Sequence, residues 1–172
     1  MSYLPKLQAI STFIFDIDGV LTDGSVIVTE SGEQQRIMNI KDGYALQLAI
    51  KKGYRIAIIS GGSSEGVRDR FTKLGVTDVF MSSHNKLKVF NDYCEKHSLE
   101  HKEILYMGDD IPDIKVLQLV GIPTCPLDAV AEVKAVSIYI SHQNGGKGAV
   151  RDVIEQVLKV QDNWMQKDAF NW

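Results

Sequence analysis

The sequence predicts an α/β fold in which helices cover both faces of a parallel sheet. Short runs that are almost wholly apolar alternate with segments whose apolar residues recur every three or four positions, the pattern of strands alternating with helices. The apolar runs contain no polar alternation, as expected of strands buried on both faces. The length of 172 residues favours one domain. We therefore expect residues 1–172 to form a single three-layer sandwich.

The apolar runs define six expected strands, which are Thr12–Phe15, Arg55–Ile59, Asp78–Met81, Ile104–Met107, Ile122–Cys125 and Ser137–Ile140. The helical periodicity defines five expected helices, which are Tyr44–Lys52, Glu65–Leu74, Lys86–His97, Asp113–Val120 and Lys147–Val160. Gly53 and Gly75 directly follow the first two helices, where glycine commonly ends a helix.

Two segments depart from this alternation. Residues 25–40 hold two strand-like stretches around Glu30-Ser31-Gly32-Glu33 and predict a β-hairpin. Its apolar residues exceed what one face of a hairpin buries on a small domain, so we predict an assembly surface. These residues are Val26, Ile27, Val28, Ile37, Met38 and Ile40. Residues 161–172 form a polar tail with two tryptophans, which we expect either to be mobile or to dock on a neighbouring subunit.

Composition excludes several classes of protein. Lysine and arginine number 19 against 22 acidic residues, for a net charge of -3, which gives no electrostatic reason to expect nucleic acid as a partner. The sequence has no apolar run long enough for a membrane span and no signal peptide at its start, so we expect a cytoplasmic protein without a membrane partner. Cys94 and Cys125 lack disulfide or zinc spacing and are interpreted as buried free thiols.

Carboxylates follow the first and the fourth expected strands. Asp16 and Asp18 follow the first, and Asp109, Asp110 and Asp113 follow the fourth. Because ligands bind beyond the carboxyl ends of parallel strands, both acidic clusters are expected at one rim of the sheet. A hard cation such as Mg²⁺ offsets the repulsion between carboxylates. An aspartate beside Mg²⁺ can attack phosphorus and form an aspartyl-phosphate.

A phosphate site is expected at the same rim. The second strand ends in Ser60-Gly61-Gly62-Ser63-Ser64 and leads into a helix, where a hydroxyl and backbone N–H groups bind anions. Lys86 begins the next helix and offers a positive charge to phosphoryl oxygens. Gly145-Gly146-Lys147-Gly148 is not a phosphate loop, because Ser141 and Gly148 occupy positions where that motif needs Gly and Ser or Thr. We interpret it as a glycine turn, with Lys147 and Arg151 as candidate substrate contacts.

These residues, in this order, resemble the haloacid dehalogenase (HAD) superfamily of phosphohydrolases over about residues 10–160. The resemblance implies a Rossmann-like HAD sandwich. Three further motifs resemble the 3-deoxy-D-manno-octulosonate 8-phosphate phosphatases within that superfamily: DGVLTDG at 18–24, KDGYA at 41–45 and GGKGAVRD at 145–152. That resemblance implies a sugar acid phosphate as substrate, no cap domain, and a homotetramer in which hairpins build a central barrel and a neighbouring subunit closes each active site.

The resemblance also implies roles for individual residues. Asp16 would be the nucleophile and Asp18 the general acid and base. Mg²⁺ would be held by the Asp16 carboxylate, the Asp18 backbone carbonyl and Asp109, with Asp110 and Asp113 supporting the metal site. The phosphoryl group would be held by Ser60, Gly61 and Lys86.

The sequence departs from the family pattern at Gly62, where the family usually has arginine, and at Pro112, where it usually has asparagine. A nine-carbon 2-keto-3-deoxy sugar acid phosphate therefore stays open as the substrate, although KDGYA favours the eight-carbon one. An inactive scaffold of the same fold is a second alternative. A signalling receiver domain is disfavoured, because Met81-Ser82 follows the third strand, where a receiver carries its phosphoacceptor aspartate. Oxygen ligands suit several divalent cations, so Mn²⁺ and Co²⁺ are alternatives to Mg²⁺ as the bound metal.

Overall fold

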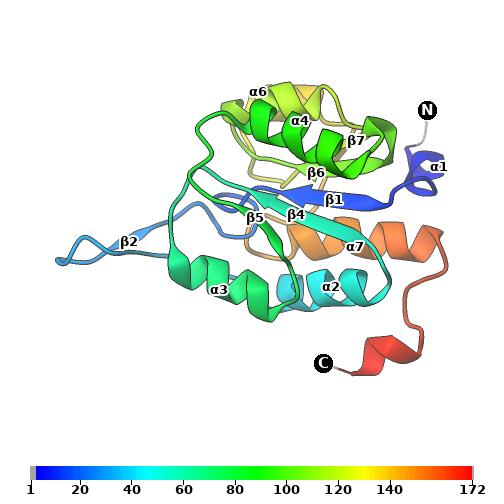
Figure 1. The fold of residues 1–172 in the computed structure, drawn as a ribbon, viewed down its shortest axis with the longest axis horizontal. Helices are drawn as coiled ribbons and strands as arrows, with labels where there is room; N and C mark the ends of the chain where they lie inside the picture. Colours follow the sequence, from blue (N-terminus) through cyan, green and yellow to red (C-terminus); the bar gives the residue numbers. More distant parts are fainter. Residues whose placement is uncertain (1–2, 172) are drawn as a thin grey trace.

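The computed structural model describes residues 3–171 and contains a six-stranded sheet with helices on both faces (Figure 1). The strands are all parallel and lie in the order β5-β4-β1-β6-β7-β8. Their bounds are β1 Thr12–Phe15, β4 Arg55–Ile59, β5 Asp78–Phe80, β6 Ile104–Met107, β7 Ile122–Cys125 and β8 Tyr139–Ile140. Strand β1 lies at the centre, hydrogen-bonded to β4 and β6. The expected fold class is confirmed.

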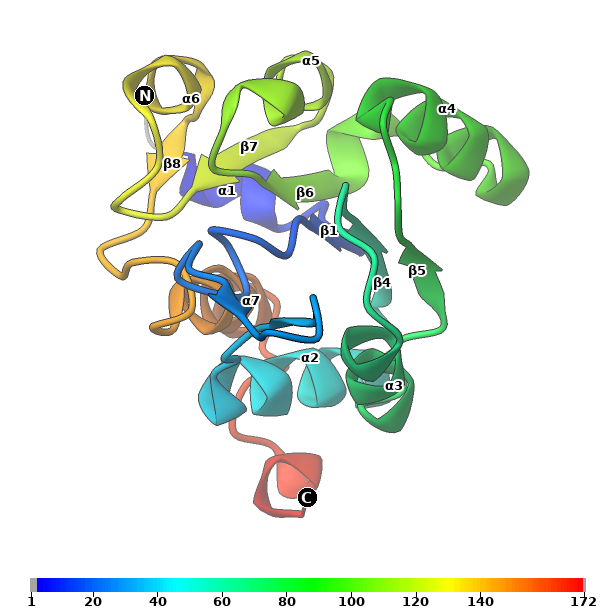
Figure 2. The same cartoon turned by 90° about the vertical axis from the view of Figure 1, so that its left-hand side faces the viewer.

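The helices form the two outer layers. Their bounds are α1 Leu4–Leu7, α2 Ile40–Lys51, α3 Glu65–Lys73, α4 Lys86–His97, α5 Ile114–Leu117, α6 Ala131–Val136 and α7 Ala149–Val160, with short 3-10 turns η1 His101–Glu103, η2 Ile111–Asp113 and η3 Lys167–Phe170. Helices α2, α3 and α7 lie on one side of the sheet, and α4, α5 and α6 lie on the other (Figure 2). Among the described residues, no segment forms a separate cap domain.

Each outer layer packs its own hydrophobic core against the sheet. Phe13 and Phe15 belong to the core with α2 and α7, whereas Ile14 belongs to the core with α4 and α5. Successive residues of a strand point to opposite faces, so a strand covered on both faces must be apolar throughout. This is why the apolar runs located the central strands correctly.

Some boundaries differ from the expected ones. Helix α2 begins at Ile40 rather than Tyr44, because the Asn39 side chain accepts a hydrogen bond from Lys41 N–H and caps the helix. The expected helix Asp113–Val120 is replaced by the turn η2 and the short helix α5. Helices α1 and α6 were not expected, since each is only one or two turns long and gives little periodic signal.

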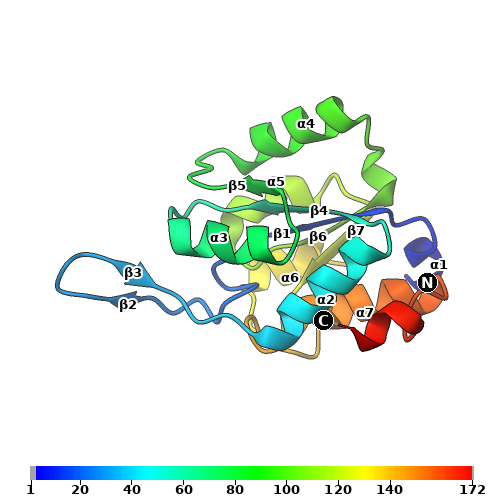
Figure 3. The same ribbon diagram turned by 60° about the horizontal axis from the view of Figure 1, so that its bottom comes forward.

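The expected hairpin is present and projects from the body of the molecule (Figure 3). Its strands are β2 Ile27–Val28 and β3 Gln34–Gln35, paired antiparallel. Val28 is 69% exposed and Ile37 is 71% exposed. The hairpin therefore presents large apolar side chains that the monomer leaves uncovered.

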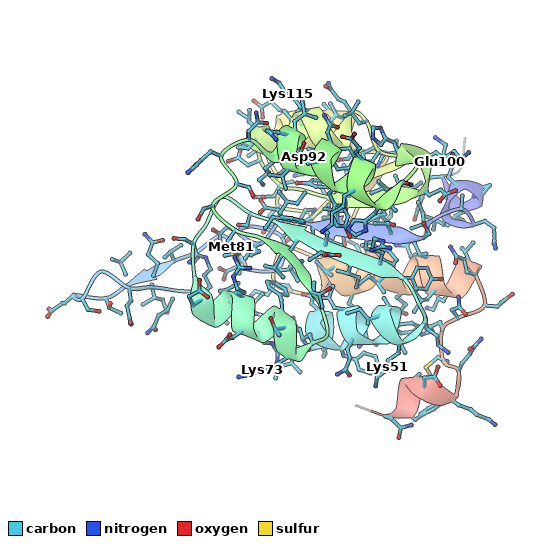
Figure 4. All side chains as sticks on the ribbon, viewed as in Figure 1. Lys51, Lys73, Met81, Asp92, Glu100 and Lys115 are labelled. Carbon is cyan, nitrogen blue, oxygen red and sulfur yellow. The ribbon has the colours of Figure 1, made fainter. Side chains whose placement is uncertain are left out.

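The C-terminal tail folds back onto its own chain rather than being free of it. Its turn η3 lies beside α2, where the Tyr44 hydroxyl donates to Ala169 O and Lys52 Nζ lies 2.7 Å from Asp168 Oδ2. Lys51, labelled on α2 in Figure 4, donates to Asn171 O at 2.8 Å. Trp172, the end of the predicted tail, lies outside the described residues, as do residues 1 and 2 of the expected domain.

Cys94 and Cys125 are buried free thiols, as expected. Within residues 3–171, no helix has the length and apolar character needed to cross a membrane.

Candidate active site

Three neighbouring strands end at the same edge of the sheet and carry the expected site residues there. Asp16 directly follows β1, Ser60 follows β4, and Gly108-Asp109 follow β6. Lys86 is the first residue of α4, whose preceding residue Asn85 caps the helix by accepting a hydrogen bond from Lys88 N–H. The topology therefore gathers chemistry from four separate parts of the sequence.

A buried lysine connects two of the carboxylates. Lys86 Nζ lies 2.6 Å from Asp16 Oδ2 and 2.7 Å from Asp113 Oδ1. Its own side chain is 7% exposed, and Asp113 is fully buried. Buried charges persist only when they are paired in this way.

Asp113 is fixed by further hydrogen bonds. The Tyr106 hydroxyl donates to Asp113 Oδ1 at 2.6 Å, and Asp109 N–H donates to Oδ2 at 3.2 Å. Tyr106 escaped the sequence analysis because it lies inside an apolar strand and reads as a core residue. Asp113 thus supports the backbone of the Asp109 loop, and its support of a metal site stays a prediction.

Carboxylate oxygens of Asp16, Asp109 and Asp113 all lie within 4.8 Å of one another. Asp109 approaches the first loop closely because Gly19 has no side chain: a Cβ at this position, where φ is +84°, would lie 2.0 Å from Asp109 Oδ2. A set of carboxylate oxygens is the donor chemistry that a hard divalent cation prefers. The residues present therefore fit Mg²⁺.

The electrostatics of the cluster favour such a cation. Burial, together with the neighbouring Asp16 and Asp113 carboxylates, raises the pKa of Asp109 to about 7. Burial also raises the pKa of Asp16 to about 6, against the opposing effect of Lys86. Burial alone would lower the pKa of Lys86, but the two carboxylates outweigh it and the pKa is raised. Lys86 thus stays charged, while Asp16 and Asp109 lack full compensation of their charge.

Asp18 does not join this carboxylate cluster with its side chain. Its two carboxylate oxygens are bound instead by Arg36, with Nε 2.6 Å from Oδ1 and Nη2 3.0 Å from Oδ2. Arg36 comes from the base of the hairpin and was missed by the sequence analysis, where it read as one polar residue among several. Only the expected backbone-carbonyl contact would bring Asp18 to a metal ion.

Other candidate residues lie in the loops that follow β4 and β6. Ser60 is buried, and its Oγ accepts a hydrogen bond from Gly62 N–H at 3.2 Å. Gly61 is exposed beside it. Asp110 is also exposed, and its carboxylate caps η2 by accepting from Ile111 N–H at 2.7 Å. It therefore supports the loop rather than pointing at the other carboxylates.

The Lys147 and Arg151 side chains make their contacts outside the cluster of Lys86 and its carboxylates. Lys147 Nζ lies 3.9 Å from Asp23 Oδ2. The Arg151 guanidinium packs over the rings of Tyr44 and Trp164, at 5.5 and 5.4 Å from their centroids. Arg151 thus holds the C-terminal segment against α2 in this structure, and its contact with a substrate stays a prediction.

A parallel sheet with a cationic lysine among carboxylates at its carboxyl edge defines a haloacid dehalogenase-like hydrolase. The family model of that description matches residues 72–154. The chain is 34% identical to the 3-deoxy-D-manno-octulosonate 8-phosphate phosphatase KdsC of Salmonella typhi over 158 residues, which span 92% of this chain and 84% of the relative. The chain therefore belongs to the family of the 3-deoxy-D-manno-octulosonate 8-phosphate phosphatases.

Solved structures agree with this placement. The phosphatase of that name from Moraxella catarrhalis, in complex with a magnesium ion, a phosphate ion and a KDO molecule, matches with a TM-score of 0.91 at 34% identity, covering 94% of this chain and 93% of that chain. The cobalt-bound phosphatase of Haemophilus influenzae matches with a TM-score of 0.90 at 27% identity, covering 96% of this chain and 98% of that chain. The whole sandwich is thus shared, not one motif.

Proposed function

We propose that this chain is a Mg²⁺-dependent phosphomonoester hydrolase that converts 3-deoxy-D-manno-octulosonate 8-phosphate into the free sugar acid and phosphate. The observation that carries the proposal is the buried contact of Lys86 with Asp16 inside a cluster of three carboxylates. The relatives named for this reaction cover nearly the whole chain. The reaction would be a step in the synthesis of this sugar acid and hence of lipopolysaccharide.

The residues divide the chemistry between two steps. Asp16 attacks phosphorus and forms an aspartyl-phosphate as the bond to the sugar oxygen breaks. Asp18 begins the cycle protonated and gives its proton to that departing oxygen, and the resulting carboxylate then takes a proton from the water that hydrolyses the aspartyl-phosphate. Asp16 would thus be the nucleophile and Asp18 the general acid and base.

The charge of the phosphoryl group is offset by the surrounding residues. Lys86 neutralises its oxygens, while the Ser60 hydroxyl and the Gly61 backbone bind it. Mg²⁺ would be held by the Asp16 carboxylate, the Asp18 carbonyl and Asp109, and when bound it supplies further positive charge to the phosphoryl oxygens. Asp113 orients Lys86 and the Asp109 loop, while Asp110 caps η2. Lys147 and Arg151 are proposed contacts for the sugar acid.

The proposal extends to the whole molecule. Residues 1–172 would form one domain, and four copies would associate through the exposed apolar residues of their hairpins, as expected from the family resemblance. The cytoplasmic location stays a prediction.

The test is phosphate release from a panel of sugar phosphates, with Mg²⁺ and with EDTA. The panel contains the eight-carbon and nine-carbon 2-keto-3-deoxy sugar acid phosphates beside ordinary hexose phosphates. We expect metal-dependent release with a marked preference for the eight-carbon substrate. Preference for the nine-carbon acid would keep the mechanism and change the substrate. Release from none of them would favour the inactive scaffold.

A further inference from the structure

The Arg36 side chain at the base of the hairpin turns inward between two exposed neighbours. Gln35 and Ile37 on either side are exposed, whereas the Arg36 side chain is 5% exposed. Its guanidinium meets the Asp18 carboxylate edge to edge, through the 2.6 and 3.0 Å contacts described above. Paired contacts of this geometry fix the plane of the carboxylate as well as its position.

The loop after β4 leaves room for this contact. A Cβ at Gly62 would lie 3.2 Å from Arg36 Nη2, 3.4 Å from Asp18 Oδ2 and 3.6 Å from Ser60 Oγ. The guanidinium therefore lies over the backbone of Gly62, in the corner between Asp18 and Ser60. Any side chain at position 62 would crowd this corner.

The pair differs from an ordinary surface ion pair. Exposed pairs contribute little, because water screens them and both side chains lose freedom. Here the arginine is nearly buried, holds both oxygens and belongs to a segment that otherwise projects away from the sheet. A requirement of the reaction for one fixed position of the Asp18 carboxylate would explain why the long Arg36 side chain is ordered here.

Proton transfer requires that the Asp18 carboxylate be held in a fixed position. A general acid or base acts only within hydrogen-bond reach of the atom that it protonates, and displacement by about 1 Å can cost roughly 10²-fold in rate. Asp18 is only half-buried and lies outside the Lys86 cluster, so that cluster does not fix its side chain.

We propose that Arg36 is a positioning residue, which holds the Asp18 carboxylate in place for proton transfer and makes the hairpin part of the active site of its own subunit. The proposal rests on the proposed function, in which Asp18 is the general acid and base. Arg36 acts entirely through Asp18 and contributes nothing once that carboxylate is removed.

The test is a double-mutant cycle on the full chain with Mg²⁺ and the eight-carbon sugar acid phosphate. Arg36→Met is expected to lower kcat by roughly 10- to 100-fold, with KM nearly unchanged. The kcat of Arg36→Lys should lie between those of the wild type and Arg36→Met, because an ammonium group replaces only part of the paired contact that a guanidinium makes. In an Asp18→Asn background, Arg36→Met should cause no further loss. Lys88→Met, which removes an exposed charge from α4, is the matched control.

A second substrate separates positioning from a general structural defect. 4-Nitrophenyl phosphate has a leaving group that needs no protonation, so the initial burst of nitrophenolate should be unchanged in Arg36→Met. Thermal melting of each variant checks its fold, and Arg36→Lys keeps the test usable if Arg36→Met unfolds.

Three results would overturn the positioning role while leaving the function intact: a wild-type kcat in Arg36→Met, an effect on KM alone, or an equal loss in the Asp18→Asn background. An inactive wild-type protein would instead overturn the proposed function, and the positioning role with it.

Discussion

The Lys86 ammonium group and the Asp16 carboxylate form a buried ion pair at 2.6 Å between residues 70 positions apart in the sequence. The same ammonium group holds Asp113 at 2.7 Å. Since moving a charge out of water costs several kcal/mol unless partners offset it, each member of this cluster depends on the others. The residues assigned to catalysis should therefore also affect the stability of the fold.

Replacement of Lys86 by methionine should destabilise the protein. Two buried carboxylates lose their partner, and we expect a loss of about 3–5 kcal/mol in the free energy of unfolding, together with loss of phosphatase activity. Urea denaturation in EDTA measures the effect. Millimolar Mg²⁺ should recover part of it, because the cation offsets the same carboxylates.

Lys88→Met is the control for this change. Lys88 lies two positions further along α4, where it pairs with Asp92 on an exposed surface that Figure 4 shows at the labelled Asp92. Its loss should change the free energy of unfolding by less than about 1 kcal/mol. Equal destabilisation by the two lysine changes would contradict the assignment of Lys86 as the partner of the buried carboxylates.

Replacement of Asp16 by asparagine should abolish turnover and leave the fold intact. The amide is not a nucleophile towards phosphorus, so we expect phosphate release to fall by at least about 10³-fold. Circular dichroism should show an unchanged spectrum and a cooperative melt. Asp92→Asn, an exposed acid on α4, should keep full activity. Turnover by clean Asp16→Asn protein would mean that the covalent step is wrongly assigned.

Removal of the metal should lower the melting temperature. A ligand at about 100 times its Kd stabilises the folded state by about 2.7 kcal/mol, so millimolar Mg²⁺ should raise Tm by several degrees, reversibly with EDTA. Asp109→Asn should lose this shift, and its Tm without metal should exceed that of the wild type because one of three mutually repelling carboxylates is removed. An equal Mg²⁺ shift in both proteins would place the cation elsewhere.

The site could be predicted from the sequence where its residues follow buried strands. Strands β1 and β6 are apolar on both faces, so Asp16 and Asp109 stand out as the first charges after them. Lys86 was recognised because it begins a helix after the third strand. These residues can be predicted because each directly follows a strand or begins a helix, and a parallel sheet brings the ends of its strands to one edge.

Contacts that depend on how distant segments meet gave no such signal. Tyr106 looks like core, and only its contact with Asp113 reveals that its hydroxyl belongs to the site. Arg36 reads as one polar residue of an exposed hairpin until the fold brings it to Asp18. The tail was expected to be mobile or to dock on a neighbour, whereas packing of Trp164 on Arg151 of its own chain directs it to α2.

Disruption of the apolar hairpin should change the oligomeric state. Ile37 is 71% exposed, and we expect Ile37→Glu to convert an assembled protein into a monomer, because a charge cannot be buried unpaired in an apolar interface. Sedimentation at micromolar concentration measures the mass. Leu119→Glu places the same charge at an exposed leucine outside the hairpin and should leave the assembly unchanged. A monomeric wild type would contradict the assembly role.

Asp42 should make the stability of the fold depend on pH. It is fully buried in α2, and its Oδ1 accepts a hydrogen bond from Arg151 N–H at 2.8 Å at the start of α7. Its Oδ2 has no hydrogen-bond partner among the described residues. Burial raises the pKa of this carboxyl to about 6, against the opposing effect of the backbone N–H groups. The native state therefore holds the Asp42 proton more tightly than the unfolded chain.

Between about pH 4 and pH 6, this group should lower the free energy of unfolding as the pH rises, by about 3 kcal/mol in total. Asp42→Asn cannot ionise, so its stability relative to the wild type should increase by that amount between pH 4 and pH 7. Urea denaturation at each pH, with Mg²⁺ present to suppress titration of the Asp16 cluster, measures the difference. Asp69→Asn, at an exposed position of α3, is the control. A difference between Asp42→Asn and wild type that stays constant with pH would show that Asp42 is ionised at little cost in the folded protein.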